Sequence, residues 1–199
     1  MNQAVLPASF YQRDTTLVAQ ELLGMRLCRR LPDGRLLSGL IVETEAYLGV
    51  DDPAAHSFGG RRTARTETMY AEGGVAYVYF IYGMHHCLNA VTRHRDQPEA
   101  VLIRALSPEH GHELWQEKFL RLKVAQWLSG PGRLCRAMQI DKSCDAMSLQ
   151  SDELWIERAE VVPESERVAA ARVGVDYAGE AALWPLRFYK RGDASVSRR

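Results

Sequence analysis

Alternating apolar and polar positions predict a chain rich in β-strands. Residues 77–82 are all aromatic or aliphatic, and Gly83 separates them from a second, mixed run that ends at Asn89. β-Branched and aromatic residues favour strands, and glycine accepts the positive φ of a tight turn. We therefore expect a β-hairpin over residues 77–89. Its period of two places Tyr77 and Tyr79 on one face and Tyr82, just before the turn, on the other.

The same pattern predicts a sheet around this hairpin. Further strands are expected at 25–30, 35–47, 101–106, 154–157, 168–175 and 186–189. In the strand 35–47, Leu40, Val42 and Thr44 alternate with Ile41, Glu43, Glu45 and Tyr47, so two carboxylates and a tyrosine are expected to share one face.

Helix signals are fewer. Asp14 is a suitable N-cap for a helix that ends near Leu23, and Ser107-Pro108 predicts a helical stretch to about Leu128. Gly130-Pro131-Gly132 breaks that stretch and begins a short helix through Met138. Residues 49–72 read as a long polar loop, and loops of this length are usually functional or disordered.

This order of elements predicts one α+β domain over residues 1–199. We expect a largely antiparallel, curved sheet with a protruding hairpin and a few packed helices. The polar residues 193–199 are expected to form a mobile tail.

Composition narrows the class of protein. Apolar residues make up 46% and charged residues 25%, which is typical of a soluble globular protein. No run of about 18 apolar residues predicts a membrane span, and the N-terminus lacks a signal-peptide pattern. The four cysteines show no CxxC spacing, so neither zinc nor disulfides are expected. We therefore expect a cytoplasmic protein with reduced thiols.

The charge balance limits any role with nucleic acids. Lys and Arg together equal Asp and Glu, at 25 each, so DNA binding would require a local basic face. Arg61, Arg62 and Arg65 in the long loop could contact phosphates, although each fits a solvated surface equally well.

The candidate catalytic groups are open to two interpretations. Glu43 or Glu45 could be a general base that activates water, or could form an ion pair, and their spacing does not choose between them. Arg104, among aliphatic neighbours, needs a buried partner, which either a catalytic carboxylate or a structural one would supply. His85 and His86 point to opposite faces of a strand, which disfavours a shared metal. The hairpin itself could be an aromatic core or a wedge that enters stacked bases.

Several blocks, taken together, carry a resemblance. They are Val42–Gly49, Ala54–Ser57, Tyr77–Asn89, Leu102–Leu106, Ser129–Cys135, Ala171–Val175, Tyr177–Glu180 and Pro185–Tyr189. In this order they resemble the alkyladenine (3-methyladenine) DNA glycosylase family of the Mpg type, over nearly the whole chain.

The resemblance implies a monofunctional glycosylase that flips a damaged purine from double-stranded DNA and hydrolyses its N-glycosidic bond, in base excision repair. Expected substrates are 3-methyladenine, 7-methylguanine, hypoxanthine and ethenoadenine. It also implies a monomer, without metal or cofactor, that associates with the bacterial nucleoid. The alternatives are a non-catalytic binder of damaged DNA and a metal-dependent hydrolase that uses His56, His85 or His86 with Glu45.

The resemblance also assigns residues. Glu45 would activate the water, which Arg104 and the carbonyl of Val173 would hold. Tyr47, His56 and Tyr79 would form the base pocket, Asn89 would exclude guanine, and Tyr82 would fill the gap in the duplex. Contacts to DNA would come from Met84, His85, Arg62, Thr63 and Arg65. Position 85 carries His where relatives often carry an aromatic residue such as Tyr.

Overall fold

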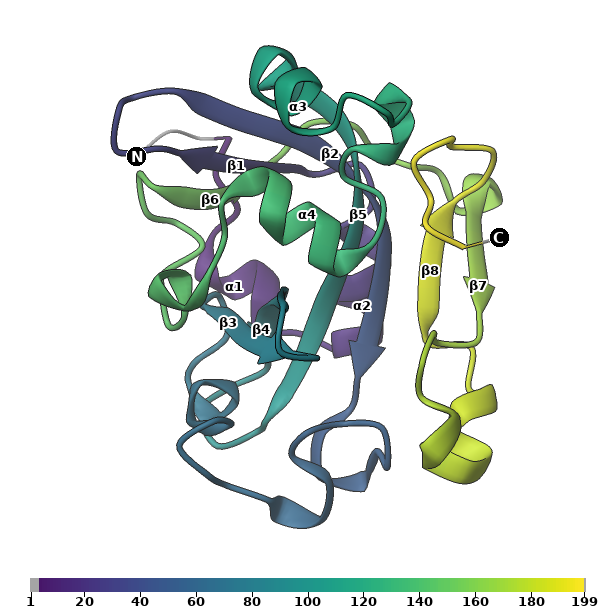
Figure 1. Ribbon diagram of the computed structural model, residues 1–199. Coiled ribbons are helices and arrows are strands. Elements are labelled where there is room, and N and C mark those ends of the chain that lie inside the picture. Colours follow the sequence, from purple (N-terminus) through teal and green to yellow (C-terminus); the bar gives the residue numbers. More distant parts are fainter. Residues whose placement is uncertain (1–3, 199) are drawn as a thin grey trace.

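A computed structural model describes residues 4–198 (Figure 1). Its centre is an antiparallel eight-stranded sheet in which the strands follow the order β3-β4-β5-β2-β1-β6, and β8 pairs with both β2 and β7. The strands are β1 (Arg26–Arg30), β2 (Leu36–Tyr47), β3 (Ala76–Ile81), β4 (His85–Thr92), β5 (Glu99–His110), β6 (Leu154–Glu157), β7 (Arg167–Ala170) and β8 (Arg187–Lys190). The protein is a single mixed α+β domain with a curled antiparallel sheet, which confirms the predicted fold class.

Helices cover this sheet and close the core. They are α1 (Ala8–Tyr11), α2 (Thr15–Glu21), α3 (His112–Lys118) and α4 (Pro131–Met138). Asp14 caps α2 as predicted, because its side chain accepts a hydrogen bond from the Leu17 amide at 3.0 Å. The Thr44 hydroxyl of β2 donates to the Ala19 carbonyl of α2 at 2.8 Å, so this face of β2 lies against the helix. Among the described residues, no helix is long and apolar enough to cross a membrane.

The loops contain short 3₁₀ turns. These are Gly49–Asp51, Phe58–Gly60, Glu67–Tyr70, Val124–Gln126, Lys142–Cys144, Glu164–Glu166 and Asp176–Leu183. Three of them lie in the segment 49–72, which is therefore folded over its whole length.

The two longest strands, β2 and β5, carry irregularities where the candidate carboxylates lie. Ile41 pairs with Leu106 and Glu43 with Ala105, whereas Thr44 pairs with Ile103, so Val42 and Arg104 have no partner in the register. A β-bulge adds such a residue and re-aims the side chains beside it. Ile41 consequently packs in the main core, and the predicted face shared by Ile41, Glu43, Glu45 and Tyr47 is wrong for Ile41.

Two predicted boundaries are also wrong. A helix was expected from Ser107, but β5 continues to His110. Pro108 pairs with Gly39 at a register shift, and such an irregularity tolerates a residue without an N–H. A Cβ on Gly39 would lie 2.7 Å from the Ser107 carbonyl oxygen, so glycine allows this close approach. The strand predicted over 168–175 ends at Ala170, and residues beyond it turn through Gly174 at φ 76°.

The expected mobile tail is packed instead. Ser195 and Val196 are buried, and the Ser197 amide donates to Glu43 Oε2 at 2.7 Å. The segment is polar by composition, but its main chain supplies hydrogen bonds to buried charges. Residue 199 lies outside the described residues.

Candidate active site

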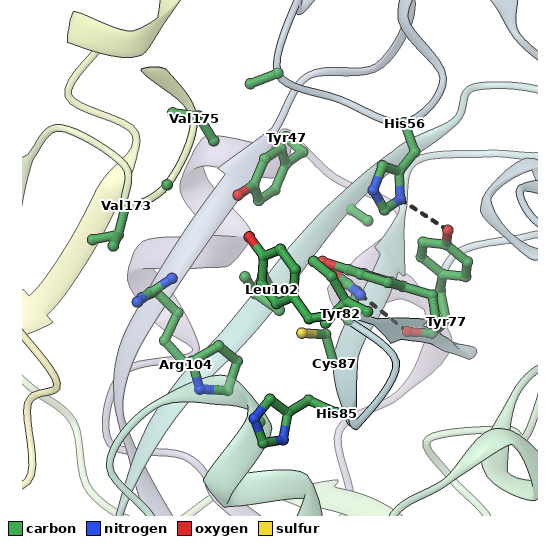
Figure 2. A pocket seen from close by; sticks show the side chains of 18 of the residues that line it. Tyr47, His56, Tyr77, Tyr82, His85, Cys87, Leu102, Arg104, Val173 and Val175 are labelled. Carbon is green, nitrogen blue, oxygen red and sulfur yellow. Dashed lines mark hydrogen bonds between the residues drawn. The ribbon is translucent and has the colours of Figure 1, made fainter. Parts of the chain in front are cut away.

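A cavity of about 420 Å³ opens beside the hairpin β3–β4. Figure 2 shows Tyr47 and His56 along one side, Val173 and Val175 along another, and Arg104 and His85 at the opposite end. The rings that line it belong to Tyr47, His56, Tyr77, Tyr79, Tyr82, His85 and Tyr177. Mostly apolar cavities of this size with a few convergent polar groups suit a flat heteroaromatic ligand.

Glu45 is fully buried and does not itself line this cavity, but it is bonded to three residues that do. Its Oε2 accepts a hydrogen bond from the Tyr47 hydroxyl at 2.8 Å, and its Oε1 accepts one from the Val173 amide at 2.7 Å. Arg104 Nη1 forms an ion pair with Oε1 at 3.2 Å. All three partners line the cavity, so the carboxylate is held next to the residues that face it.

Glu43 has a different environment on the same strand. Its Oε1 accepts from Arg104 Nε at 3.1 Å and from Arg187 Nη1 at 3.0 Å, and its Oε2 accepts from the Ser197 amide. Like Glu45, Glu43 does not line the cavity, and of its three partners only Arg104 does so. The structure thus separates the two glutamates that spacing alone left equivalent: Glu43 is an anchor for two guanidinium groups, and Glu45 is bonded to the cavity wall.

Arg104 links these carboxylates from the bulge in β5. It is almost completely buried, and its Nε and Nη1 reach different glutamates while Nη2 donates to Ser197 Oγ at 3.3 Å. The planar fork of donors makes Arg suitable for such bridging. Both interpretations of Arg104 from the sequence therefore describe parts of one network.

Tyr47 forms one aromatic wall, and a buried ion pair fixes it from behind. The Arg172 guanidinium lies 4.8 Å from the Tyr47 ring centroid, and its Nη2 donates to Asp52 Oδ1 at 2.8 Å. Asp52 and the Arg172 side chain are fully buried. Sequence reasoning missed this pair, and the signal was the charged Arg172 inside an otherwise small and apolar run.

The phenol of Tyr47 stays protonated in this setting. Burial, followed by the negative charge of Glu45, raises the pKa of Tyr47 well above its usual value. The hydroxyl therefore remains a hydrogen-bond donor to Glu45 at neutral pH.

His56 and Tyr79 form the opposite wall. Their rings meet edge to face with centroids 4.5 Å apart, and His56 Nδ1 lies 3.0 Å from the Tyr77 hydroxyl. Burial, followed by the charges of Arg65 and Arg61, lowers the pKa of His56 to about 4. His56 is thus a neutral imidazole at pH 7. The sequence analysis placed Tyr77 on the same hairpin face as Tyr79 but gave it no role. In the structure Tyr77 also lines the cavity.

Asn89 lies at the inner end of the cavity. It is buried, and its Nδ2 donates to the Tyr77 carbonyl at 3.1 Å across the β3–β4 pair. Asn89 lines the cavity, and this bond fixes the orientation of its amide group there.

The hairpin turn presents two large apolar side chains to solvent. Tyr82 is 79% exposed and Met84 is 69% exposed. Tyr82 and Gly83 both have positive φ, at 54° and 66°, which matches the twist of a tight hairpin. For tyrosine this conformation costs about 1–2 kcal/mol, and strain of this kind is concentrated at functional sites.

The remaining predicted DNA-binding residues are more dispersed. His85 packs on Gly132, where a Cβ would lie 2.9 Å from the imidazole, and both line the cavity. Arg65 lies 5.4 Å from the Tyr79 ring centroid, at the cavity rim. Arg62 is bound by Glu67 at 2.6 Å and Asp96 at 2.8 Å, and Thr63 is exposed beside it. Within residues 4–198, no cluster of three His, Cys, Asp or Glu side chains could hold a metal ion.

Comparison with known proteins identifies the family of this chain. The family model described as Methylpurine-DNA glycosylase (MPG) matches residues 9–194. A Bdellovibrio bacteriovorus protein named "Putative 3-methyladenine DNA glycosylase" is 48% identical over 98% of this chain and 100% of its own length. Proteins with the same name from Desulfitobacterium hafniense and Bacillus cereus are each 47% identical, over 96% and 97% of this chain and 98% of their own length. The chain therefore belongs to the methylpurine-DNA glycosylase family, the DNA repair glycosylases of alkylated purines.

Proposed function

We propose that the protein is a monofunctional DNA-3-methyladenine glycosylase that hydrolyses the N-glycosidic bond of a flipped, alkylated purine by means of a water activated by Glu45. The observation that carries the proposal is the Glu45 carboxylate, bonded to Tyr47, Val173 and Arg104 at the wall of an aromatic cavity. A general base must lie within reach of the reacting group, and this carboxylate borders the space that the base would enter.

Access to the base requires flipping. Chemistry on a base inside a duplex requires that it leave the stack, at a cost of about a few kcal/mol. The exposed ring of Tyr82, at the end of a rigid hairpin, would enter the space left behind and recover part of that cost. Met84 and His85 on the same turn would lie along the minor groove.

The cavity walls favour an electron-poor purine. Tyr47 on one side and His56 with Tyr79 on the other would sandwich the base, and aromatic faces attract cationic rings. An alkylated purine such as 3-methyladenine or 7-methylguanine carries positive charge and a weakened glycosidic bond. Asn89, fixed by Tyr77, would reject the exocyclic amino group of normal guanine.

The hydrolytic step then needs one carboxylate. As the purine leaves with the bonding electron pair, the sugar becomes oxocarbenium-like, and the negative charge of Glu45 stabilises it. Glu45 accepts a proton from the water whose oxygen bonds to the sugar carbon. Arg104 and the Val173 carbonyl would orient that water.

Neutral lesions are a separate case within the same proposal. Hypoxanthine and ethenoadenine leave more easily after protonation, and His56, with a pKa of about 4, is not an imidazolium general acid at pH 7. We infer that these lesions are processed more slowly than cationic ones and that their proton comes from solvent.

Binding to duplex DNA would be local rather than global, because the chain has equal numbers of positive and negative side chains. Arg65 at the cavity rim and Thr63 nearby are suited to phosphate contacts, whereas Arg62 already pairs with Glu67 and Asp96 and would add little net charge. We propose that the protein acts as a monomer.

A base-release assay tests the function directly. The purified protein is incubated with duplexes that carry 3-methyladenine, 7-methylguanine or hypoxanthine, and with an undamaged duplex as control, and the free base is measured. Release from the alkylated duplexes supports the proposal. Tight binding without release would identify a non-catalytic binder of damaged DNA, and loss of release with a chelator would identify a metal-dependent hydrolase.

A further inference from the structure

The segment after β8 reaches the back of the active-site network. It runs beside β8 toward the end marked C (Figure 1). Val196 is buried in a cluster with Val42, Ala105 and Tyr189, so it is anchored against both β2 and β5. Arg187 Nη1 donates to the Arg198 carbonyl at 2.9 Å, which ties the segment to β8 as well.

Ser197 is the residue of this segment that joins the charged groups. Its amide N–H donates to Glu43 Oε2 at 2.7 Å, and its hydroxyl oxygen accepts from Arg104 Nη2 at 3.3 Å. One serine therefore contacts both members of the Glu43–Arg104 ion pair.

The position of Arg104 depends on these contacts. Its guanidinium is planar, so fixing Nε on Glu43 and Nη2 on Ser197 fixes where Nη1 points, and Nη1 is the nitrogen that reaches Glu45. Because Arg104 is almost fully buried, an Nη2 without its acceptor would seek another partner or rotate. Either response would weaken the contact with Glu45.

We propose that Ser197 is a positioning residue of the active site, which holds the Arg104 guanidinium so that Nη1 faces Glu45 and the attacking water. The inference rests on the proposed function of Glu45 and Arg104, and it extends the active site to the segment after β8, of which Ser197 acts through Arg104.

The test compares three variants in single-turnover release of 3-methyladenine. Ser197→Ala keeps the amide bond to Glu43 and removes the acceptor for Arg104. Ser197→Thr keeps a hydroxyl oxygen at the same position. Ser195→Ala is the matched control, because Ser195 is buried two residues earlier and, among the described residues, shows no hydrogen bond to Glu43 or Arg104. Affinity for abasic-site DNA and the melting temperature are measured for all variants.

We expect Ser197→Ala to lower the rate of base release about tenfold, as removal of one hydrogen bond to a charged group would do. Ser197→Thr should restore most of the rate, Ser195→Ala should match the wild type, and affinity for abasic-site DNA should not change. Wild-type rates for Ser197→Ala, or a rate loss that Ser197→Thr does not rescue, would overturn the proposal. A wild-type protein that releases no base would instead refute the proposed function itself.

Discussion

Arg104 and Glu45 form a buried ion pair, with Nη1 and Oε1 separated by 3.2 Å, at the point where two strand bulges meet. The same guanidinium binds Glu43, so the candidate base and its structural neighbour share one cation. The positive charge of Arg104 therefore lies beside Glu45 but is shared with Glu43. Under the proposed mechanism, the geometry of Arg104 as well as its charge should affect the rate of base release.

Arg104→Lys tests that geometry. A lysine ammonium keeps the charge but is a single point that cannot reach Glu43, Glu45 and Ser197 in one plane. We expect base release to fall by about a hundredfold, equivalent to about 2.7 kcal/mol, with a smaller loss of affinity for abasic-site DNA.

Arg26→Lys is the matched control for that variant. Arg26 also bridges two carboxylates, with Glu109 at 2.6 Å and Glu157 at 2.9 Å, but lies outside the cavity. Its replacement should leave base release unchanged. Equal rates for Arg104→Lys and Arg26→Lys would show that Arg104 serves only the fold.

Tyr82→Gly separates the wedge role from the hairpin. Glycine adopts positive φ without strain, so the turn should form and the melting temperature should change little. Affinity for lesion duplexes should fall at least about tenfold, because the ring that would occupy the gap is gone. Tyr82→Phe retains the ring and should bind like the wild type; if Tyr82→Gly also binds normally, the wedge role is excluded.

The pH dependence of stability should carry a contribution from His56. Its pKa is about 4 in the folded protein and near 6.5 when unfolded, so between these values the unfolded chain binds more protons. Stability is therefore expected to fall as pH drops from about 6.5 toward 4. His56→Asn should flatten this part of the curve of melting temperature against pH, and an unchanged curve would show that His56 binds its proton equally well in the folded and unfolded protein.

Local signals in the sequence were sufficient for much of the fold. Alternation found the hairpin and β6, Asp14 marked the start of α2, and Gly130-Pro131-Gly132 marked the start of α4. These features depend on residues close together in the chain. The extension of β5 through Pro108 depends instead on a register shift in β2, which the pattern of β5 alone does not contain.

The candidate site likewise depends partly on local motifs and partly on long-range contacts. Motif resemblance placed Glu45, Tyr47, His56, Tyr79 and Asn89 together, and the structure brings them to one cavity or its wall. Spacing alone did not distinguish Glu43 from Glu45; the resemblance favoured Glu45, and their different partners depend on long-range contacts, since Ser197 is 154 residues away from Glu43. Long-range bonds of this kind, like the Asp52–Arg172 pair behind Tyr47, leave little trace in local spacing.

The central claim is that the Glu45 carboxylate activates water, and Glu45→Gln tests it most directly. Glutamine preserves the size of the side chain and one carbonyl oxygen, which can accept from either Tyr47 or Val173, while removing the base. Single-turnover release of 3-methyladenine should fall by at least about a thousandfold, with affinity for the lesion duplex retained. Release at the wild-type rate by the folded Glu45→Gln protein would contradict the account.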